Sequence, residues 1–138
     1  MTADTKTILR RSALLSNLTD EDLDSLLALA NERTFEAGAP LVQAGSTDSL
    51  GMWVIIEGSV DVSRNGQHLA TLGPGEHVGE MALVTDIRRS ADVTATTPLR
   101  TLQLTRWDLR GLVADHPDIA LAIMDAMAAR LAEQNALR

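Results

Sequence analysis

The chain has 138 residues, 45% of them hydrophobic, which is enough for one globular domain with its own core. It contains no cysteine, which excludes disulfides, thiolate metal sites and cysteine nucleophiles. The formal net charge of −7 argues against direct nucleic-acid binding, and no apolar run approaches the about 20 residues that a membrane span needs.

Residues 1–31 are expected to form two helices. The first is predicted from about Lys6 to Leu15. Thr19 followed by three acidic residues is typical of an N-cap with an acidic first turn, and it predicts a second helix to about Ala30. Because this region has charges but no hydrophobic signal core, we expect a cytoplasmic location.

Residues 32–105 have the pattern of many short strands. Apolar segments such as Trp53-Val54-Ile55-Ile56 are separated by glycines, and Asn65-Gly66 is a strong hairpin signal. Regular turn signals between short strands indicate a sandwich or barrel. We therefore expect a mainly β fold with flanking helices, in which about eight strands form a β-roll (jelly roll) and Trp53 fills its interior.

The stretch from Gly79 to Ala91 interrupts this pattern with a short helical insertion. Gly79-Glu80 leads into the apolar run Met81-Ala82-Leu83, and a loop then ends in Arg89-Ser90-Ala91. Glycine lets an anion approach the backbone, and the following helical turn offers unpaired N–H groups at the positive end of its dipole. Arginine binds phosphate through two parallel N–H bonds, and a serine hydroxyl adds a third donor. The stretch is therefore a candidate anion site.

This stretch resembles the phosphate-binding cassette of cyclic nucleotide-binding domains, the fold of the bacterial catabolite activator and of protein kinase A regulatory subunits. The order of helices and strands follows the same family, so the resemblance covers nearly the whole chain. It implies that main-chain amides, arginine and serine hold the cyclic phosphate, and that Glu80 accepts the ribose 2′-OH. The implied phosphate and ribose site consists of Gly79, Glu80, Met81, Ala82, Arg89, Ser90 and Ala91.

Two closing helices are expected over residues 106–138. Thr105 and Asp108 are spaced as in a capping box, which predicts a helix to about Ala114 with Trp107 packed at the helix junction. Pro117 suits the first position of a last helix. The wide apolar face of that helix consists of Ile119, Ala122, Ile123, Met124, Ala126, Met127 and Leu131. One roll covers less than this, so we expect burial against the roll and against a second copy in a homodimer. The alternative is a monomer whose last helix folds back on the roll.

Three polar residues near the C-terminus are candidates for contact with the base. By the resemblance, Arg130 reaches toward Glu80, and Gln134 and Asn135 match the polar pair with which the catabolite activator contacts the base. Amide side chains offer a donor and an acceptor to an adenine edge. The alternative is that these residues end a helix in water, where fraying is expected.

The expected function is that of a single regulatory domain over residues 1–138 that binds a cyclic nucleotide monophosphate, cAMP rather than cGMP. We expect no catalysis, no cofactor and no metal. Ligand capture is expected to draw the cassette inward and to move the closing helices, and an effector protein would receive the signal. With 138 residues we expect no room for a DNA-binding module after the closing helices.

Two other classes stay open. A ligand-free interaction or dimerisation module on the same fold is compatible with Arg88 and Asp92, which stand where many family members carry proline and an uncharged residue. A cupin-like metalloenzyme has faint support from Pro74-Gly75-Glu76-His77 followed by Glu80. A metal site needs converging ligands, and the histidines form no His-x-His pair. Those histidines are His68, His77 and His116.

Overall fold

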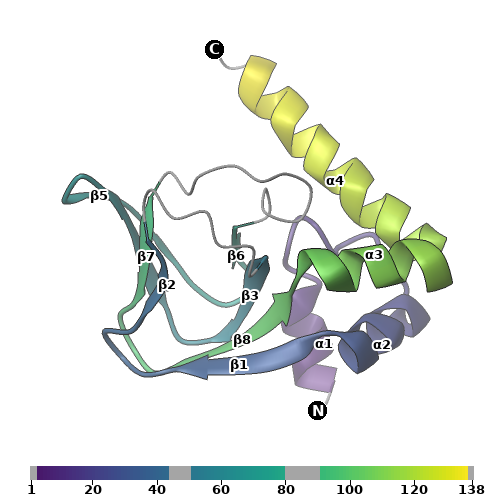
Figure 1. Cartoon of the computed structure of the whole chain (residues 1–138), viewed down its shortest axis with the longest axis horizontal. Helices are drawn as coiled ribbons and strands as arrows, with labels where there is room; N and C mark the ends of the chain where they lie inside the picture. The colour runs from purple at the N-terminus through teal and green to yellow at the C-terminus, as the bar shows by residue number, and fades with distance from the viewer. Residues whose placement is uncertain (1–2, 44–50, 80–90, 137–138) are drawn as a thin grey trace.

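The computed structural model describes the backbone of residues 3–43, 51–79 and 91–136, and their side chains except those of residues 3, 4, 130, 131 and 133–136. In these ranges, eight strands form two antiparallel four-stranded sheets that face each other as a β-roll (Figure 1). One sheet has the order β1-β8-β3-β6 and the other β2-β7-β4-β5. The strands are β1 (Asn31–Phe35), β2 (Pro40–Val42), β3 (Met52–Glu57), β4 (Val60–Arg64), β5 (Gln67–Leu72), β6 (His77–Val78), β7 (Asp92–Ala95) and β8 (Leu99–Leu104). The predicted eight-stranded roll is confirmed.

The hairpin between β4 and β5 forms where the sequence predicts it. Asn65 and Gly66 have positive φ angles of 53° and 78°, as the two central residues of a tight hairpin turn require. On either side of the turn, Arg64 pairs with Gln67. Asparagine tolerates the left-handed conformation and glycine adopts it without steric cost, so this pair of residues sets the register of both strands.

The second N-terminal helix, α2 (Asp20–Leu29), begins and ends close to its predicted bounds. The Thr19 hydroxyl accepts a hydrogen bond from the Asp22 amide, and the Asp22 carboxylate accepts one from the Thr19 amide. This reciprocal capping satisfies two backbone donors that the first helical turn leaves unpaired. Leu23 and Leu26, one turn apart, are buried on the face that packs against the sheet.

The first helix, α1 (Ala3–Leu9), is shorter than predicted. The apolar pattern predicts a helix to about Leu15, but after Leu9 the backbone continues in turns closed by i→i+3 bonds. The Ser12 hydroxyl accepts from the Leu14 amide at 3.3 Å and so competes for a donor that a longer helix would use. The turns still bury Leu14 and Leu15, so the apolar pattern correctly predicts their burial but not their backbone conformation.

Two helices follow the strands, as predicted: α3 (Arg106–Asp115) and α4 (Pro117–Ala136). Thr105 and Asp108 form the capping box of α3. Trp107 does not pack at the helix junction: it is 65% exposed, and the Arg110 guanidinium lies 4.7 Å from its ring centroid. The prediction failed because Leu109 and Leu112 occupy the buried face of α3. No helix within the described ranges has both the length and the apolar run that a membrane crossing requires.

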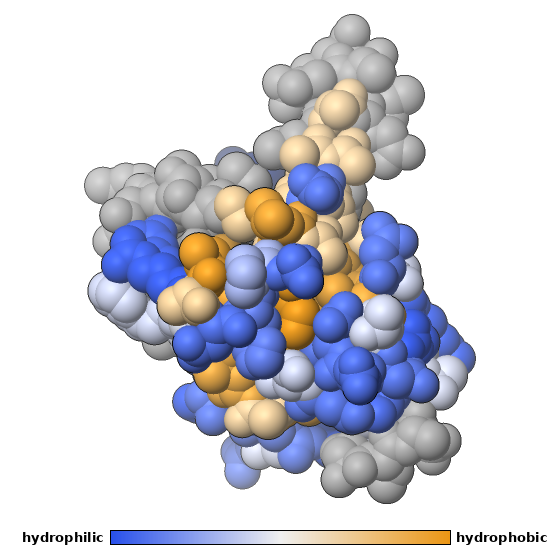
Figure 2. Space-filling view, turned by 90° about the vertical axis from the view of Figure 1, so that its right-hand side faces the viewer, coloured by the Kyte–Doolittle hydropathy of each residue, from blue (hydrophilic) through white to orange (hydrophobic). Residues whose placement is uncertain are grey.

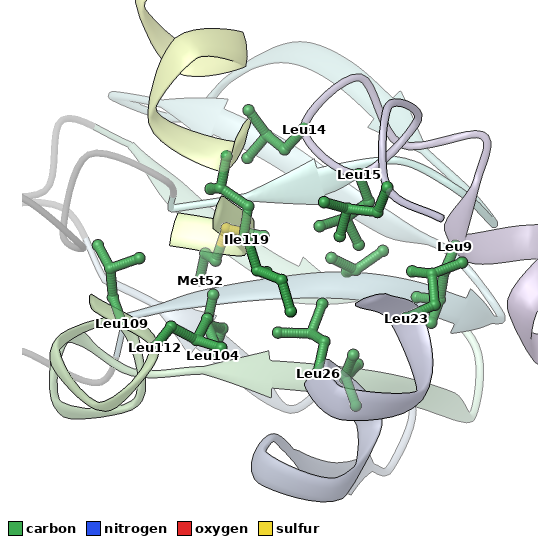
Figure 3. Close-up of a cluster of buried hydrophobic side chains, with 14 of the residues drawn as sticks. Leu9, Leu14, Leu15, Leu23, Leu26, Met52, Leu104, Leu109, Leu112 and Ile119 are labelled. Atoms are coloured by element: carbon green, nitrogen blue, oxygen red, sulfur yellow. The ribbon is translucent and has the colours of Figure 1, made fainter. Parts of the chain in front are cut away.

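The sheet β1-β8-β3-β6 separates two hydrophobic clusters, since alternate side chains of a strand point to opposite faces. The cluster between this sheet and the helices, shown in Figure 3, is called here the helix-side core. Its buried members include Leu9, Leu14, Leu15, Leu23, Leu26, Met52, Val54, Ile56, Leu102, Leu104, Leu109, Leu112, Ile119 and Ile123. The cluster between the two sheets is called the roll interior. It consists of Leu41, Val42, Trp53, Ile55, Val60, Val78, Val93, Ala95 and Leu99. Trp53 is 2% exposed, which confirms that it fills the roll.

Candidate functional site

The segment predicted to bind an anion connects the two sheets of the roll. β6 ends at Val78 on the edge of one sheet, and β7 begins at Asp92 inside the other. Gly79, directly after β6, has a φ of 85°, a conformation that residues with a Cβ rarely adopt. Ala91, directly before β7, is half-buried. The chain therefore leaves one wall of the roll at Gly79 and joins the other wall after Ala91.

These two residues are the only predicted ligand contacts whose side chains or backbone the structure describes at the cassette. The other predicted phosphate and ribose contacts lie outside the described residues: Glu80, Met81, Ala82, Arg89 and Ser90. The predicted base contacts belong to α4, but their side chains lie outside the described ones: Arg130, Gln134 and Asn135. The pairing of Arg130 with Glu80 therefore stays a prediction.

The described walls beside this connection are apolar. Val78 and Val93, one at each end, are 6% and 5% exposed and belong to the roll interior. Val93 also pairs with Val42 across the β2–β7 ladder. These wall residues are not among the predicted site residues. The alternation of polar and apolar residues along Asp92–Ala95 is the signal that could have found Val93.

Backbone hydrogen bonds anchor the strand that leads into the connection. β6 pairs with β3, with Trp53 opposite Val78. Just before β6, the Ile55 amide donates to the Glu76 carbonyl at 2.9 Å, and the Gly75 amide donates to the Ile55 carbonyl at 2.8 Å. The strand that leads into the cassette is thus hydrogen-bonded to β3, whose side chains alternate between the roll interior and the helix-side core.

The histidines considered for a metal site lie on different elements. His68 Nε2 is 3.1 Å from Asp61 Oδ1 across the β4–β5 hairpin. His77 Nδ1 is 3.5 Å from Ser12 Oγ, and His116 is the C-cap of α3. Among the residues whose structure is described, no three His, Asp or Glu side chains converge as a metal site requires.

Known proteins resemble this chain over most of its length. The family profile described as "Cyclic nucleotide-binding domain" matches residues 32–116. Glutaminase 2 of Bradyrhizobium diazoefficiens is 36% identical over 127 residues, which are 91% of this chain and 20% of that protein. The Cyclic AMP receptor protein of Thermus thermophilus is 32% identical over 130 residues, 91% of this chain and 60% of that protein. The chain thus spans a fifth of one relative and three fifths of the other.

Comparison with solved structures points to the same family. The N-terminal domain of a transcriptional regulator from Streptomyces coelicolor superposes with a TM-score of 0.84 and 33% identity, covering 93% of this chain and 94% of that one. The matched profile runs from β1 through α3 and so includes both sheets and the connection between them. The chain belongs to the cyclic nucleotide-binding domain family, the family that its Gly79–Ala91 stretch resembles.

Proposed function

We propose that this domain binds a cyclic nucleotide monophosphate as a regulatory signal, prefers cAMP to cGMP, and has no catalytic activity. The observation that carries the proposal is the coincidence of the family match with the site: the cassette motif falls on the connection between the two sheets, beginning at the left-handed Gly79. The relative from T. thermophilus is a cyclic AMP receptor protein, and this similarity supports cAMP as the ligand proposed for this chain.

Each part of such a ligand has a matching group in the sequence. Backbone amides after Gly79, together with Arg89 and Ser90, suit a cyclic phosphate, because helix N-termini and arginine both favour bound anions. Glu80 suits the ribose hydroxyl as an acceptor. Gln134 and Asn135 on α4 suit the base edge, since amides supply both donors and acceptors.

The signal would pass from the cassette to α4. Ligand would draw the cassette inward, Leu83 and its neighbours would repack, and Arg130 would bridge α4 to Glu80. A ligand shifts the equilibrium between two conformations only if its contacts differ between them. The proposed Arg130–Glu80 bridge would form only in the ligand-bound conformation and would supply that difference. In the described part of α4, Ile119 and Ile123 are buried in the helix-side core, so a shift of α4 would also move α3.

The proposed receiver of the signal is a dimer that acts on an effector protein. α4 extends away from the roll, and Figure 2 shows it standing out from the body of the molecule. On its outer side Leu121 is 56% exposed and Met124 is 39% exposed, and Ala128 and Ala132 continue the same stripe. Spacings of three and four residues place these side chains on one face, as in helices that pack against a parallel copy. A second copy of α4 would cover the stripe.

The dimer is tested by sedimentation equilibrium with Leu121→Glu. A buried glutamate opposite its own copy opposes association through desolvation and like-charge repulsion, so the dimer dissociation constant should rise at least about tenfold. Leu69→Glu, at a leucine that is 47% exposed on β5, is the matched control and should leave association unchanged. A parent chain that sediments as a 14.8 kDa monomer at high concentration would contradict the dimer.

Ligand binding is tested by thermal unfolding with cAMP and with cGMP, for the parent chain, Arg89→Ala and Arg88→Ala. Ligand at 100 times its dissociation constant adds about 2.7 kcal/mol to the free energy of unfolding. At this chain length the melting temperature should rise by roughly 10 °C. Arg89→Ala should abolish the rise.

Arg88→Ala is the control matched in charge and position, and it should retain most of the rise. Equal losses in both variants would mean that positive charge in general, not a specific clamp, holds the ligand. No rise with either nucleotide at millimolar concentration would instead favour the ligand-free interaction module on the same fold.

A further inference from the structure

The roll interior contains a polar group for which the described residues offer no hydrogen-bond partner. Trp53 is 2% exposed, and its indole Nε1–H is buried with no hydrogen-bond acceptor among the described residues. The residues around it in the cluster are aliphatic, apart from Phe35, whose ring centroid lies 6.3 Å away at an interplanar angle of 78°. Buried donors are nearly always paired in native proteins, so an unpaired one calls for a specific explanation.

The position of Trp53 relates this donor to the cassette. Trp53 lies directly opposite Val78 in the β3–β6 ladder, and directly opposite residues of a sheet share a face, with Cβ atoms about 5 Å apart. Gly79, where the connection between the sheets begins, is the next residue after Val78. The indole therefore lies beside the start of the predicted ligand site, on the inner face of the roll.

The neighbour of Trp53 on β8, opposite the Val78 side, is polar. Gln103 on β8 pairs with Trp53 in register and is 5% exposed. Gln103 has an interaction of its own, and the Thr101 hydroxyl, further along the same face, donates to the Arg33 carbonyl at 2.9 Å. The buried polar groups beside Trp53 are thus engaged elsewhere, and the indole N–H is the donor left over in this described part of the interior.

We propose that Trp53 is a ligand-reading residue whose Nε1–H donates a hydrogen bond to an acceptor atom of the bound cyclic nucleotide. The inference rests on the proposed function. Its physical basis is that a donor already desolvated by the fold has no bond to water to give up on binding, so pairing it with a ligand acceptor is a nearly complete gain. The same donor penalises an occupant that offers only apolar atoms, and it therefore adds selectivity as well as affinity.

The test follows the indole N–H signals of the full chain by NMR after labelling tryptophan with ¹⁵N. The chain has two tryptophans, and Trp107→Phe assigns the signals, because Trp107 is 65% exposed on α3. With saturating cAMP, the Trp53 N–H signal should shift downfield and its hydrogen exchange should slow at least about tenfold, while the Trp107 signal stays in place.

A second measurement separates the hydrogen bond from packing. In the Trp107→Phe chain, Trp53 is replaced biosynthetically by 3-benzothienylalanine, which keeps the bicyclic shape and carries sulfur in place of N–H. Loss of one neutral hydrogen bond should raise the cAMP dissociation constant by roughly tenfold. Phe35→Leu is the control, since it alters the packing around the indole and keeps the donor, and its dissociation constant should change by less than about threefold.

The outcomes distinguish the two proposals. Nucleotide binding with an unchanged Trp53 signal, or with equal affinity for the sulfur analogue, overturns the role of Trp53 and leaves the proposed function intact. Binding of neither nucleotide to the parent chain overturns both. A shifted signal together with weakened binding of the analogue supports both.

Discussion

The two faces of the sheet β1-β8-β3-β6 both pack against buried hydrophobic side chains, but they differ in how their buried polar groups are paired. The helix-side core is apolar throughout its described members, and ion pairs such as Lys6 with Asp24 lie at its rim. The polar Ser12 buried on that side accepts a hydrogen bond from its own loop. The roll interior instead holds an indole donor that nothing in the described residues accepts.

The difference indicates which face is complete without a partner. A core that only stabilises the fold gains nothing from an unpaired donor, because such a group costs about 1–3 kcal/mol. A surface that receives a ligand recovers this cost on binding, and functional sites commonly hold such unfavourable groups. We therefore expect the helix-side core to serve stability and the roll interior to be the half that receives the proposed ligand.

Two adjacent isoleucines on β3 allow the two faces of the sheet to be tested separately. Ile55 is 0% exposed in the roll interior, and Ile56 is 4% exposed in the helix-side core. Each substitution to alanine removes buried apolar volume and leaves a cavity, so Ile55→Ala and Ile56→Ala should each lower the free energy of unfolding by about 2–5 kcal/mol. Urea denaturation of the ligand-free chain measures both.

The two variants should differ in their affinity for cAMP. Ile55→Ala alters the roll interior, where the nucleotide is proposed to bind, and should raise the cAMP dissociation constant by about tenfold, or 1.4 kcal/mol. Ile56→Ala should leave it within about threefold, because its side chain points to the helices. Isothermal titration calorimetry on folded protein gives both constants. An equal loss of cAMP affinity in the two variants would mean that ligand binding does not depend on the roll interior more than on the helix-side core.

The sequence predicted the fold well because its signals are local. The Asn65-Gly66 turn, the Thr19 N-cap and the Thr105 capping box each depend on residues within one turn of each other, and all three form as predicted. The end of α1 was missed because the competing bond is made by the Ser12 side chain, which a periodicity of apolar residues does not register. Trp107 was misplaced because helix phase relative to a neighbour is a tertiary property.

The candidate site was predictable in part for the same reason. The cassette residues are close in sequence, so their spacing predicts a candidate site, and its described ends, Gly79 and Ala91, directly follow β6 and directly precede β7. The walls come from strands far apart in the chain, and only the ladder pairing of Trp53 with Val78 and Gln103 brings them together. No local pattern carries that information.

The smallest expected effect concerns the rim of the helix-side core. Arg10 donates a hydrogen bond to Asp20 at the start of α2 and forms an ion pair with it. The hydrogen bond first, and the Arg10 charge second, hold the pKa of the Asp20 carboxyl below its ordinary value of 3.8. A lowered folded-state pKa gives stability that is present above the ordinary value and lost as the pH falls through the lower one. Asp20→Asn should therefore cost stability at neutral pH, and its difference from the parent chain should shrink below pH 3.8.

Urea denaturation at pH 7 and at about pH 3, in low and high salt, measures this difference, with Glu21→Gln as the exposed neighbouring control. Exposed ion pairs are screened, so high salt should remove most of the Asp20 contribution. A contribution that is unchanged by acid and by salt would contradict the ion-pair explanation. A loss as large as that of Ile56→Ala would mean that charge at the rim, rather than apolar packing beneath it, holds the helices to the sheet.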